Sequence, residues 1–101
     1  MFNGIMIRND KVAVTTTSTV IVRTRASEII RTAFIIRNTS SNDADIITIA
    51  LGQEVATSNK GIVLRKNESW SDSSETGYQC HQGQISAVCE TANGQLSIME
   101  K

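Results

Sequence analysis

The sequence predicts an all-β fold: an antiparallel β-sandwich of about eight short strands with little helix, in which a jelly-roll arrangement or a small barrel are variants. Two observations predict it. The 101 residues include thirteen Ile, seven Val and eleven Thr, but only three Leu and no Pro, and side chains branched at Cβ fit a pleated strand better than a helix. Short apolar runs also alternate with polar turns about every 8–12 residues, as in β-sandwiches. The length fits one domain, residues 1–101.

Alternation of apolar and polar side chains places the strands between these turns. The first two candidates are weak and are separated by a turn at Asn9-Asp10. In order, the expected strands are Ile5–Arg8, Val12–Thr17, Thr19–Arg25, Thr32–Asn38, Asp45–Leu51, Ile62–Arg65 and Glu68–Ser71, followed by a final hairpin. Ser27–Thr32 is the one helix candidate, although Ile29 and Ile30 within it favour a strand.

The final hairpin is the element that the sequence specifies best. Asn93-Gly94 is the signature of a two-residue type I′ turn, because both residues tolerate positive φ. A turn at this point pairs the two flanking strands and puts their apolar side chains on one face. Those side chains are Ile85, Ala87, Cys89, Leu96 and Ile98. The sequence therefore predicts a half-buried antiparallel pair at the end of the chain.

Composition argues against two classes of partner. Ten Lys and Arg balance ten Asp and Glu, whereas a general nucleic-acid binder needs excess positive charge to neutralise phosphates. No apolar run has the length of a bilayer-spanning helix, and the N-terminal residues do not follow the pattern of an export signal. We therefore expect neither nucleic acid nor a membrane as partner.

The cysteines and the single histidine predict no metal or cofactor site. Cys80, His81 and Cys89 lie close in sequence, but zinc needs four ligands, or three and a water, usually from closely spaced cysteine pairs. The hairpin pattern places Cys89 in the core, where a thiol behaves as a small hydrophobe. A disulfide between Cys80 and Cys89 is the alternative. His81 is the only candidate imidazole base, and it lies beside an expected turn at Gln82-Gly83.

Two pairs of carboxylates, Asp43 with Asp45 and Asp72 with Glu75, have the residue types of acid–base catalysis. Both pairs fall in polar turns, where short acidic side chains commonly stabilise the turn itself. We therefore expect that the chain is not an enzyme.

Carbohydrate binding is an open alternative. Trp70 and Tyr78 flank the loop-like segment Ser71–Gly77, in which Asp72 and Glu75 supply polar groups. Together the two rings are candidates for an aromatic platform on which a sugar stacks. Alternatively, Trp70 packs against the edge of the sandwich and Tyr78 covers one end of the core.

Charge is distributed unevenly along the chain. Residues 1–40 hold six basic and two acidic residues, net +4, and residues 41–101 hold four basic and eight acidic residues, net −4. If the two sets occupy opposite faces, identical subunits attract one another; the alternative is ordinary solvated strand faces. The candidate assembly contacts are Arg23, Arg25, Arg31 and Arg37.

Three segments in the middle and at the end of the chain form a pattern of strands and turns. They are Phe34–Ser40; Ala56–Leu64 followed by Glu68-Ser69-Trp70; and Gly83–Val88 leading to Gly94–Glu100. In this order they resemble the small all-β virion proteins of tailed bacteriophages, over roughly residues 34–101. The chain has Lys66-Asn67 where that family usually has Pro-Gly, and residues 1–33 show no resemblance.

The resemblance implies a capsid decoration (cement) protein or a head fibre, made in the bacterial host cytoplasm and located in the virion. Such a protein binds the major capsid protein as a homo-oligomer, often a trimer, and opposes rupture of the shell through many weak contacts. The alternative function is a carbohydrate-binding adhesion module of a phage tail or head fibre. Residues 1–17 lie outside the resembling region and alternate weakly, so we expect an N-terminal arm or an intersubunit strand there.

Overall fold

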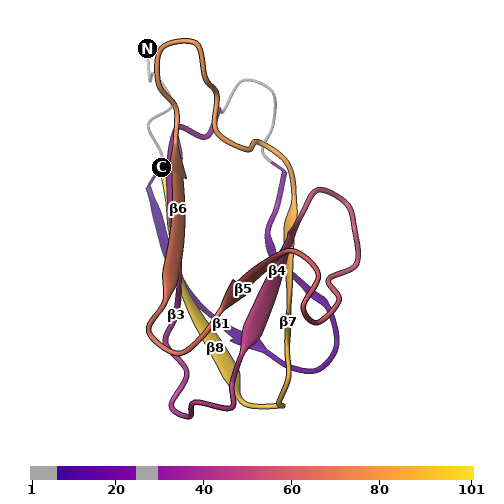
Figure 1. The fold of residues 1–101 in the computed structure, drawn as a ribbon. Coiled ribbons are helices and arrows are strands. Elements are labelled where there is room, and N and C mark those ends of the chain that lie inside the picture. Colours follow the sequence, from indigo (N-terminus) through magenta and orange to yellow (C-terminus); the bar gives the residue numbers. More distant parts are fainter. Residues whose placement is uncertain (1–6, 25–29) are drawn as a thin grey trace.

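The computed structural model describes residues 7–24 and 30–101. Its eight strands form two four-stranded antiparallel sheets that pack face to face (Figure 1), and the described residues contain no helix. The strands are β1 (Arg8–Val14), β2 (Thr19–Val22), β3 (Ala33–Asn38), β4 (Ile47–Leu51), β5 (Ile62–Leu64), β6 (Ser69–Ser73), β7 (Ile85–Cys89) and β8 (Gly94–Glu100). The predicted all-β sandwich of about eight short strands is confirmed. Of the helix candidate, residues 30–32 are not helical and residues 27–29 lie outside the described part of the chain.

The strand order is β1-β8-β3-β6 in one sheet, called sheet A, and β2-β7-β4-β5 in the other, called sheet B. Four pairs are nested within one another along the chain: β4 with β5, β3 with β6, β2 with β7, and β1 with β8. Two further pairs, β3 with β8 and β4 with β7, complete the sheets. This is the strand order of an eight-stranded jelly roll.

Strand β1 corrects the prediction for the N-terminal region. Asn9-Asp10 does not form a turn; both residues pair with β8, opposite Met99 and Ile98. Arg8 and Asp10 lie on the same side of the strand, and their side chains are joined by a 2.7 Å hydrogen bond. This mutual pairing makes a polar sequence compatible with a strand.

The prediction for the final hairpin is confirmed for its buried face and wrong for its pairing. Its five apolar side chains are all buried, but β7 belongs to sheet B and β8 to sheet A, so the chain crosses between sheets at residues 90–93. Neither Asn93 nor Gly94 has a positive φ, which excludes the type I′ turn. Gly94 is needed for a different reason: an added Cβ would lie 2.7 Å from both Cys89 Sγ and the Val14 carbonyl oxygen.

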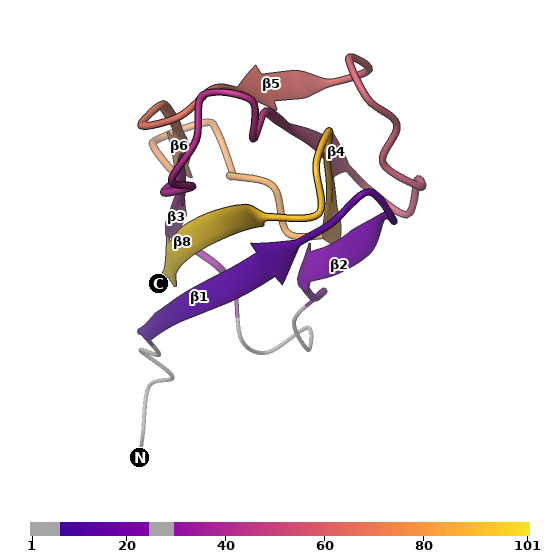
Figure 2. The ribbon, with the colours of Figure 1, turned by 90° about the horizontal axis from the view of Figure 1, so that it is seen from below.

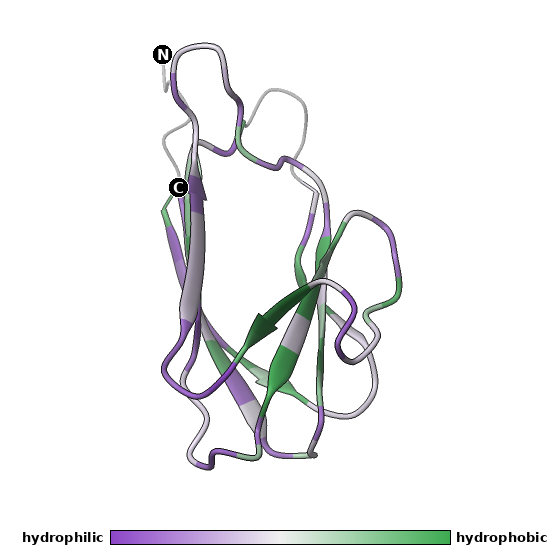
Figure 3. Ribbon diagram, viewed as in Figure 1, coloured by the Kyte–Doolittle hydropathy of each residue, from purple (hydrophilic) through white to green (hydrophobic). Residues whose placement is uncertain are grey.

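The core fills the space between the sheets with inward-facing side chains from all strands except β6, whose Trp70 packs against its margin. Figure 3 shows hydrophobic residues concentrated on β4 and β5, with hydrophilic residues in the turns. The main buried aliphatic and aromatic residues are Val14, Ile21, Val22, Phe34, Ile36, Ile47, Ile49, Leu64, Ile85, Leu96 and Ile98.

The outer face of sheet B is covered by the chain itself. The connection between β4 and β5 folds back over it, and the Asn59 N–H donates a 3.1 Å hydrogen bond to the hydroxyl of the buried Thr48. A second small apolar cluster forms beneath this connection, consisting of Ala50, Ala56 and Val88. The two outer faces of the sandwich therefore differ, because only sheet B carries such a cover in the described part of the chain.

Candidate functional site

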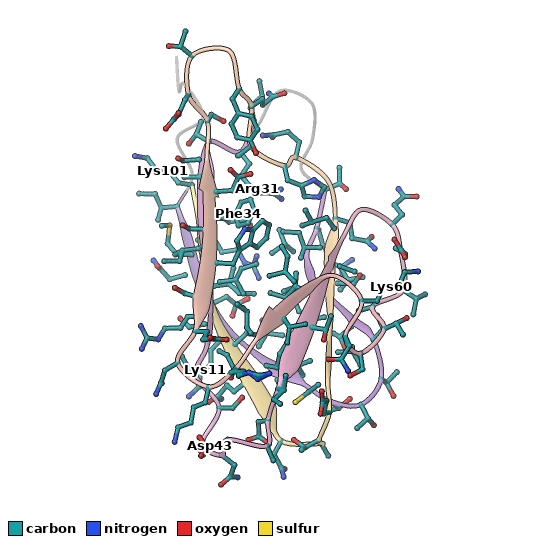
Figure 4. All side chains as sticks on the ribbon, viewed as in Figure 1. Lys11, Arg31, Phe34, Asp43, Lys60 and Lys101 are labelled. Atoms are coloured by element: carbon teal, nitrogen blue, oxygen red, sulfur yellow. The ribbon has the colours of Figure 1, made fainter. Side chains whose placement is uncertain are left out.

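Arg31 is buried at one end of the sandwich, with a side-chain exposure of 0%. Its Nε donates a 2.8 Å hydrogen bond to Glu100 Oε2. Its Nη1 and Nη2 donate to the backbone carbonyls of His81, at 2.7 Å, and Arg23, at 2.9 Å. Figure 4 shows Arg31 between the two sheets beside Phe34, and the guanidinium carbon lies 5.9 Å from the Phe34 ring centroid. The prediction that Arg31 contacts a neighbouring subunit is therefore wrong, since its side chain is enclosed within its own sandwich.

Gln82 fixes the backbone of Arg31. Its Oε1 accepts a 2.7 Å hydrogen bond from the Arg31 N–H, and its Nε2 donates to the Arg31 carbonyl oxygen at 2.6 Å. The Cys80 thiol also donates to that carbonyl, at 3.3 Å. The side-chain amide thus supplies the donor and the acceptor that a neighbouring strand would supply in a sheet. Cys80 and Cys89 are both free and buried, as the core-thiol interpretation predicted.

The Arg31–Glu100 pair was not identified from the sequence, although one signal for it exists. In β8 the inward positions are occupied by Leu96, Ile98 and Glu100, so the alternation itself directs a carboxylate into the interior. A buried carboxylate needs a buried positive partner. Nothing local indicates that Arg31 is the partner, because the two residues lie far apart in sequence.

Residues of β1 and β2 line a cleft of about 410 Å³. These two strands are edge strands of different sheets, and Figure 2 shows them side by side. Its apolar lining consists of Val12, Val20 and Ile21, and its polar lining of Arg8, Asp10, Arg23, Thr24 and Glu100. Arg8 Nη1 lies 3.0 Å from Glu100 Oε1, and Arg8 Nη2 lies 2.7 Å from Asp10 Oδ2.

Hydrogen bonds from the Arg8 side chain and the Lys11 N–H hold the pKa of Asp10 below its ordinary value. Asp10 therefore stays ionised at neutral pH and compensates the charge of Arg8. The charged side chains that β1 contributes to the cleft are thus paired with each other and with Glu100, and Arg8 Nη2 also donates a 3.3 Å hydrogen bond across the cleft to the Ile21 carbonyl oxygen of β2.

The outer face of sheet A is largely exposed. Ile35, 39% exposed, lies at its centre opposite Met99 on β8 and Ser71 on β6. In the next row across the sheet, Ser97 lies between Lys11 and Arg37. The twelve outward positions of the four strands include no Asp or Glu; they are Asn9, Lys11, Ala13, Ala33, Ile35, Arg37, Ser69, Ser71, Ser73, Gln95, Ser97 and Met99. This face is therefore apolar at its centre and basic beside it, and it includes the predicted contact residue Arg37.

Trp70 is half-buried on the inner side of β6 and packs against the core. Its ring meets that of Phe34 edge to face, with centroids 5.0 Å apart and an interplanar angle of 69°. This arrangement matches the interpretation in which Trp70 packs against the sandwich.

Tyr78 is the exposed member of the predicted aromatic pair, at 53%. Its hydroxyl donates a 2.7 Å hydrogen bond to Asp72 Oδ2, and its backbone forms an antiparallel bridge with Glu75. The structure thus brings Tyr78, Asp72 and Glu75 together at one end of the sandwich. The hydrogen bond to the Asp72 carboxylate raises the pKa of the Tyr78 hydroxyl above its ordinary value, and burial adds to the effect.

Two of the predicted regions are only partly described. In the segment 1–17, residues 8–14 form β1 and pair with β8 of the same chain, whereas residues 1–6 lie outside the described part. The role of the segment between subunits stays a prediction. Of the remaining predicted contacts, Arg23 is exposed beside the cleft, and Arg25 lies outside the described residues.

Comparison of the chain with protein-family models, curated proteins and solved structures found no match. Within residues 7–24 and 30–101, no three His, Cys, Asp or Glu side chains gather as a metal site would require. The same residues include no helix with the length and apolarity needed to cross a membrane.

Proposed function

We propose that this chain is a structural protein of a tailed bacteriophage: a capsid decoration protein that binds the head surface as a homo-oligomer, with a trimer favoured, and stabilises it. Its partner is the major capsid protein or another virion protein, and it acts by contact rather than by catalysis. Two lines of support are the resemblance of residues 34–101 to virion proteins and the jelly-roll strand order, which is common among viral capsid domains. The fold supports the proposal by analogy, because one fold serves many functions.

The observation that carries the proposal is the open outer face of sheet A. Ile35 and Met99 give it an apolar centre, and Lys11 and Arg37 give it positive charge. A sheet face of this kind suits the binding of a protein surface that offers apolar contact and carboxylates. Sheet B is shielded by its own β4–β5 connection, so sheet A is the better candidate for the side that faces the shell.

Two measurements test the proposal. Size-exclusion chromatography with light scattering at micromolar concentration should give a multiple of the 11.0 kDa chain mass. Cosedimentation with phage heads that lack this protein should then carry it into the pellet. A protein that stays monomeric and stays in the supernatant with such heads would contradict the proposal.

Charge reversal on the proposed face sharpens the head-binding test. The double variant K11E/R37E should bind heads about tenfold more weakly, equivalent to ~1.4 kcal/mol, because it turns the basic row acidic. Lys60→Glu is the matched control, since Lys60 is an exposed lysine of the connection that covers sheet B. Equal binding by K11E/R37E and the control would exclude sheet A as the docking face.

The second candidate is a carbohydrate-binding adhesion module of a phage tail or head fibre. The observation that favours it is the exposed Tyr78 ring, oriented by Asp72 beside Glu75, and jelly rolls are also common among lectins. A glycan array with the wild type and Tyr78→Ala tests it. Binding that Tyr78→Ala abolishes would favour this function, and an array without signal would argue against it.

A further inference from the structure

A pocket of about 530 Å³ lies beside the β4–β5 connection, and neither candidate function uses it. Three segments line it: Thr16 of the β1–β2 connection, residues 56–59 of the β4–β5 connection, and residues 88–90 at the end of β7. No strand of sheet A contributes to it, and Tyr78 does not line it. Its volume falls in the range of small-molecule sites, about 300–1,000 Å³.

The buried part of the lining is apolar and small. Ala56 and Val88 belong to the second apolar cluster, and Cys89 is buried beside them. None of these side chains is aromatic, so they offer no ring on which a flat ligand could stack. They do offer contact to the C–H groups of a small ligand.

Hydrogen bonds hold the β4–β5 side of the pocket in place. The Ala56 N–H donates to Ser18 Oγ at 2.9 Å, and the Asn59 N–H donates to the hydroxyl of the buried Thr48 at 3.1 Å. The Lys60 N–H donates to the Thr57 carbonyl oxygen at 3.0 Å, which closes the turn between them. The pocket is therefore formed before a ligand arrives, and preorganisation of this kind lowers the cost of binding.

The exposed part of the lining is rich in hydroxyl groups. Thr16, Thr57 and Ser58 carry hydroxyls, and Asn59 carries an amide. Within the described part of the chain, the side chains of Thr16, Thr57 and Asn59 make no hydrogen bond to another protein group. A hydroxyl can donate and accept, and an amide does the same through its two polar atoms. These groups are therefore available to a ligand.

Glu90 adds one carboxylate to the pocket. Its Oε2 accepts a long hydrogen bond, 3.4 Å, from the Ser58 hydroxyl. Among residues 7–24 and 30–101, no Lys, Arg or His forms an ion pair with it, and the neighbouring Lys60 pairs with Glu54 at 2.9 Å. The Glu90 carboxylate can thus accept hydrogen bonds from a ligand, and such bonds are stronger than those between neutral groups.

A neutral ring with several hydroxyl groups matches this lining best. Its hydroxyls can exchange hydrogen bonds with the Thr and Asn side chains and donate to Glu90, while its C–H groups contact the apolar part. An anion would meet the Glu90 charge without a compensating cation. A basic side chain would gain a single exposed carboxylate, and an exposed ion pair contributes little.

We propose that this pocket binds one neutral sugar residue, free or at the end of a glycan, with Glu90 and Thr57 as hydrogen-bonding residues. The site is independent of the head-binding face proposed on sheet A. It also differs from the candidate glycan contact at Tyr78, because Tyr78 precedes the start of β7 and the pocket lies at the end of that strand.

Titration of the isotope-labelled full-length protein, followed through its backbone N–H signals by NMR, tests the proposal. The neutral ligands are glucose, galactose, mannose and N-acetylglucosamine; N-acetylneuraminic acid is the anionic comparison and ethylguanidinium the cationic one. At least one neutral sugar should shift the signals of residues 57–59 and Glu90, and neither charged compound should. Tighter binding of an oligosaccharide that ends in the preferred sugar would support a glycan as the source, and equal binding would support the free sugar.

Two variants and one control locate the binding. Glu90→Ala should weaken binding of the preferred sugar about tenfold or more, as for lost hydrogen bonds to a charged group, and Thr57→Val about two- to tenfold. Glu54→Ala is the matched control, because Glu54 is an exposed glutamate of the same connection that does not line the pocket. Both altered side chains are exposed, so N–H signals away from the pocket should match those of the wild type.

Three results would overturn the proposal. The first is that no neutral sugar shifts the signals of the lining, up to the solubility limit of the sugar. The second is that ethylguanidinium alone shifts them, which would assign the pocket to a basic side chain. The third is that a sugar binds Glu90→Ala and Thr57→Val as tightly as it binds the wild type, which would place it elsewhere. Cosedimentation of Glu90→Ala with phage heads should equal that of the wild type, so the proposed function is tested separately.

Discussion

Arg31 Nε lies 2.8 Å from Glu100 Oε2, and the pair joins a segment before β3 to the last residue of β8 inside the sandwich. We expect Arg31→Met to lower the free energy of unfolding by about 3–5 kcal/mol, the range for removing one partner of a buried ion pair. The substitution takes a positive charge from beside a buried carboxylate and a donor from the His81 carbonyl. Urea denaturation followed by Trp70 fluorescence measures the change.

Arg37→Met is the control for that experiment, because Arg37 is an exposed arginine on the adjacent β3. Its effect should stay within about 0.5 kcal/mol, as for most surface substitutions. A similar loss in both variants would show that burial of the Arg31–Glu100 pair does not matter for stability.

Gly94→Ala should destabilise the protein by about 1–3 kcal/mol, the usual range for overpacking a well-packed site. The added methyl group would meet Cys89 Sγ and the Val14 carbonyl oxygen, neither of which is the far end of a flexible side chain. Thermal unfolding measures the effect. Gly83→Ala is the comparison, since its Cβ would meet only the His81 ring, at 3.2 Å and beyond. A larger loss in Gly83→Ala would contradict the close approach described at Gly94.

Tyr78 should ionise at a higher pH than a free tyrosine, because ionisation breaks its hydrogen bond to Asp72 and places two negative charges together. The raised pKa favours the protonated form in the native state. The stabilisation of the native state by this hydrogen bond is therefore fully present below the unfolded-state pKa of tyrosine, about 10, and is lost as pH rises through the native-state pKa of Tyr78. Tyr78 is the only tyrosine. The change in ultraviolet absorbance that accompanies tyrosine ionisation therefore reports on Tyr78 alone. Asp72→Asn should bring the pKa back towards its ordinary value; an unchanged titration would exclude the hydrogen bond.

Trp70→Ala and Tyr78→Ala should separate structural from surface roles. Trp70 packs on Phe34 and the core, so its truncation should cost about 3 kcal/mol, the lower end for large aromatic residues. Tyr78 is exposed, and its truncation should change stability by less than about 0.5–1 kcal/mol, the worth of one hydrogen bond at the surface. Chemical denaturation measures the free energy of unfolding of both variants. Equal losses would mean that Tyr78 is also part of the packed end of the sandwich.

The alternation in the sequence was sufficient to predict which apolar side chains of the last two strands are buried, but not which strands pair. Ile85 and Ala87 on β7, like Leu96 and Ile98 on β8, face the core as expected. A period of two determines the face of a strand, and any strand with a buried face satisfies it equally well. The Asn93-Gly94 pattern permits a type I′ turn but does not require one, and neither residue has a positive φ here. The close approach of the Val14 carbonyl oxygen to Gly94 joins residues far apart in sequence, so no local pattern indicates it.

The candidate sites were less predictable because they are assembled from distant segments. Arg31 has its partners at Glu100 and in the loop at His81, and the cleft joins β1 to β2 across two sheets. Arg31 follows two isoleucines in the sequence, but this apolar neighbourhood did not by itself indicate that the arginine is buried. Tyr78 and Asp72 were predictable as neighbours, since they lie only six residues apart in sequence.

The nested pairing of the strands predicts an order of folding. The β4–β5 pair is closest in sequence and β1–β8 is furthest apart, so the inner pair should form earlier. Leu64→Ala in β5 should mainly slow folding, and Val14→Ala in β1 should mainly speed unfolding. Stopped-flow chevron plots measure both rates. A reversed pattern would show that the outer pair nucleates the fold.

This nesting also changes the entropic cost of bringing β1 and β8 together. Closing β1 directly onto β8 means closing a loop that contains most of the chain, and the cost of closure grows with loop length. Once β4 meets β5, the β3–β6 pair closes across only the short connections that remain, and the same holds for each pair outward. A protein whose first and last strands are neighbours can thus complete its sheets through a series of short steps. During synthesis, however, β1 has no partner strand of sheet A beside it until β8 has left the ribosome.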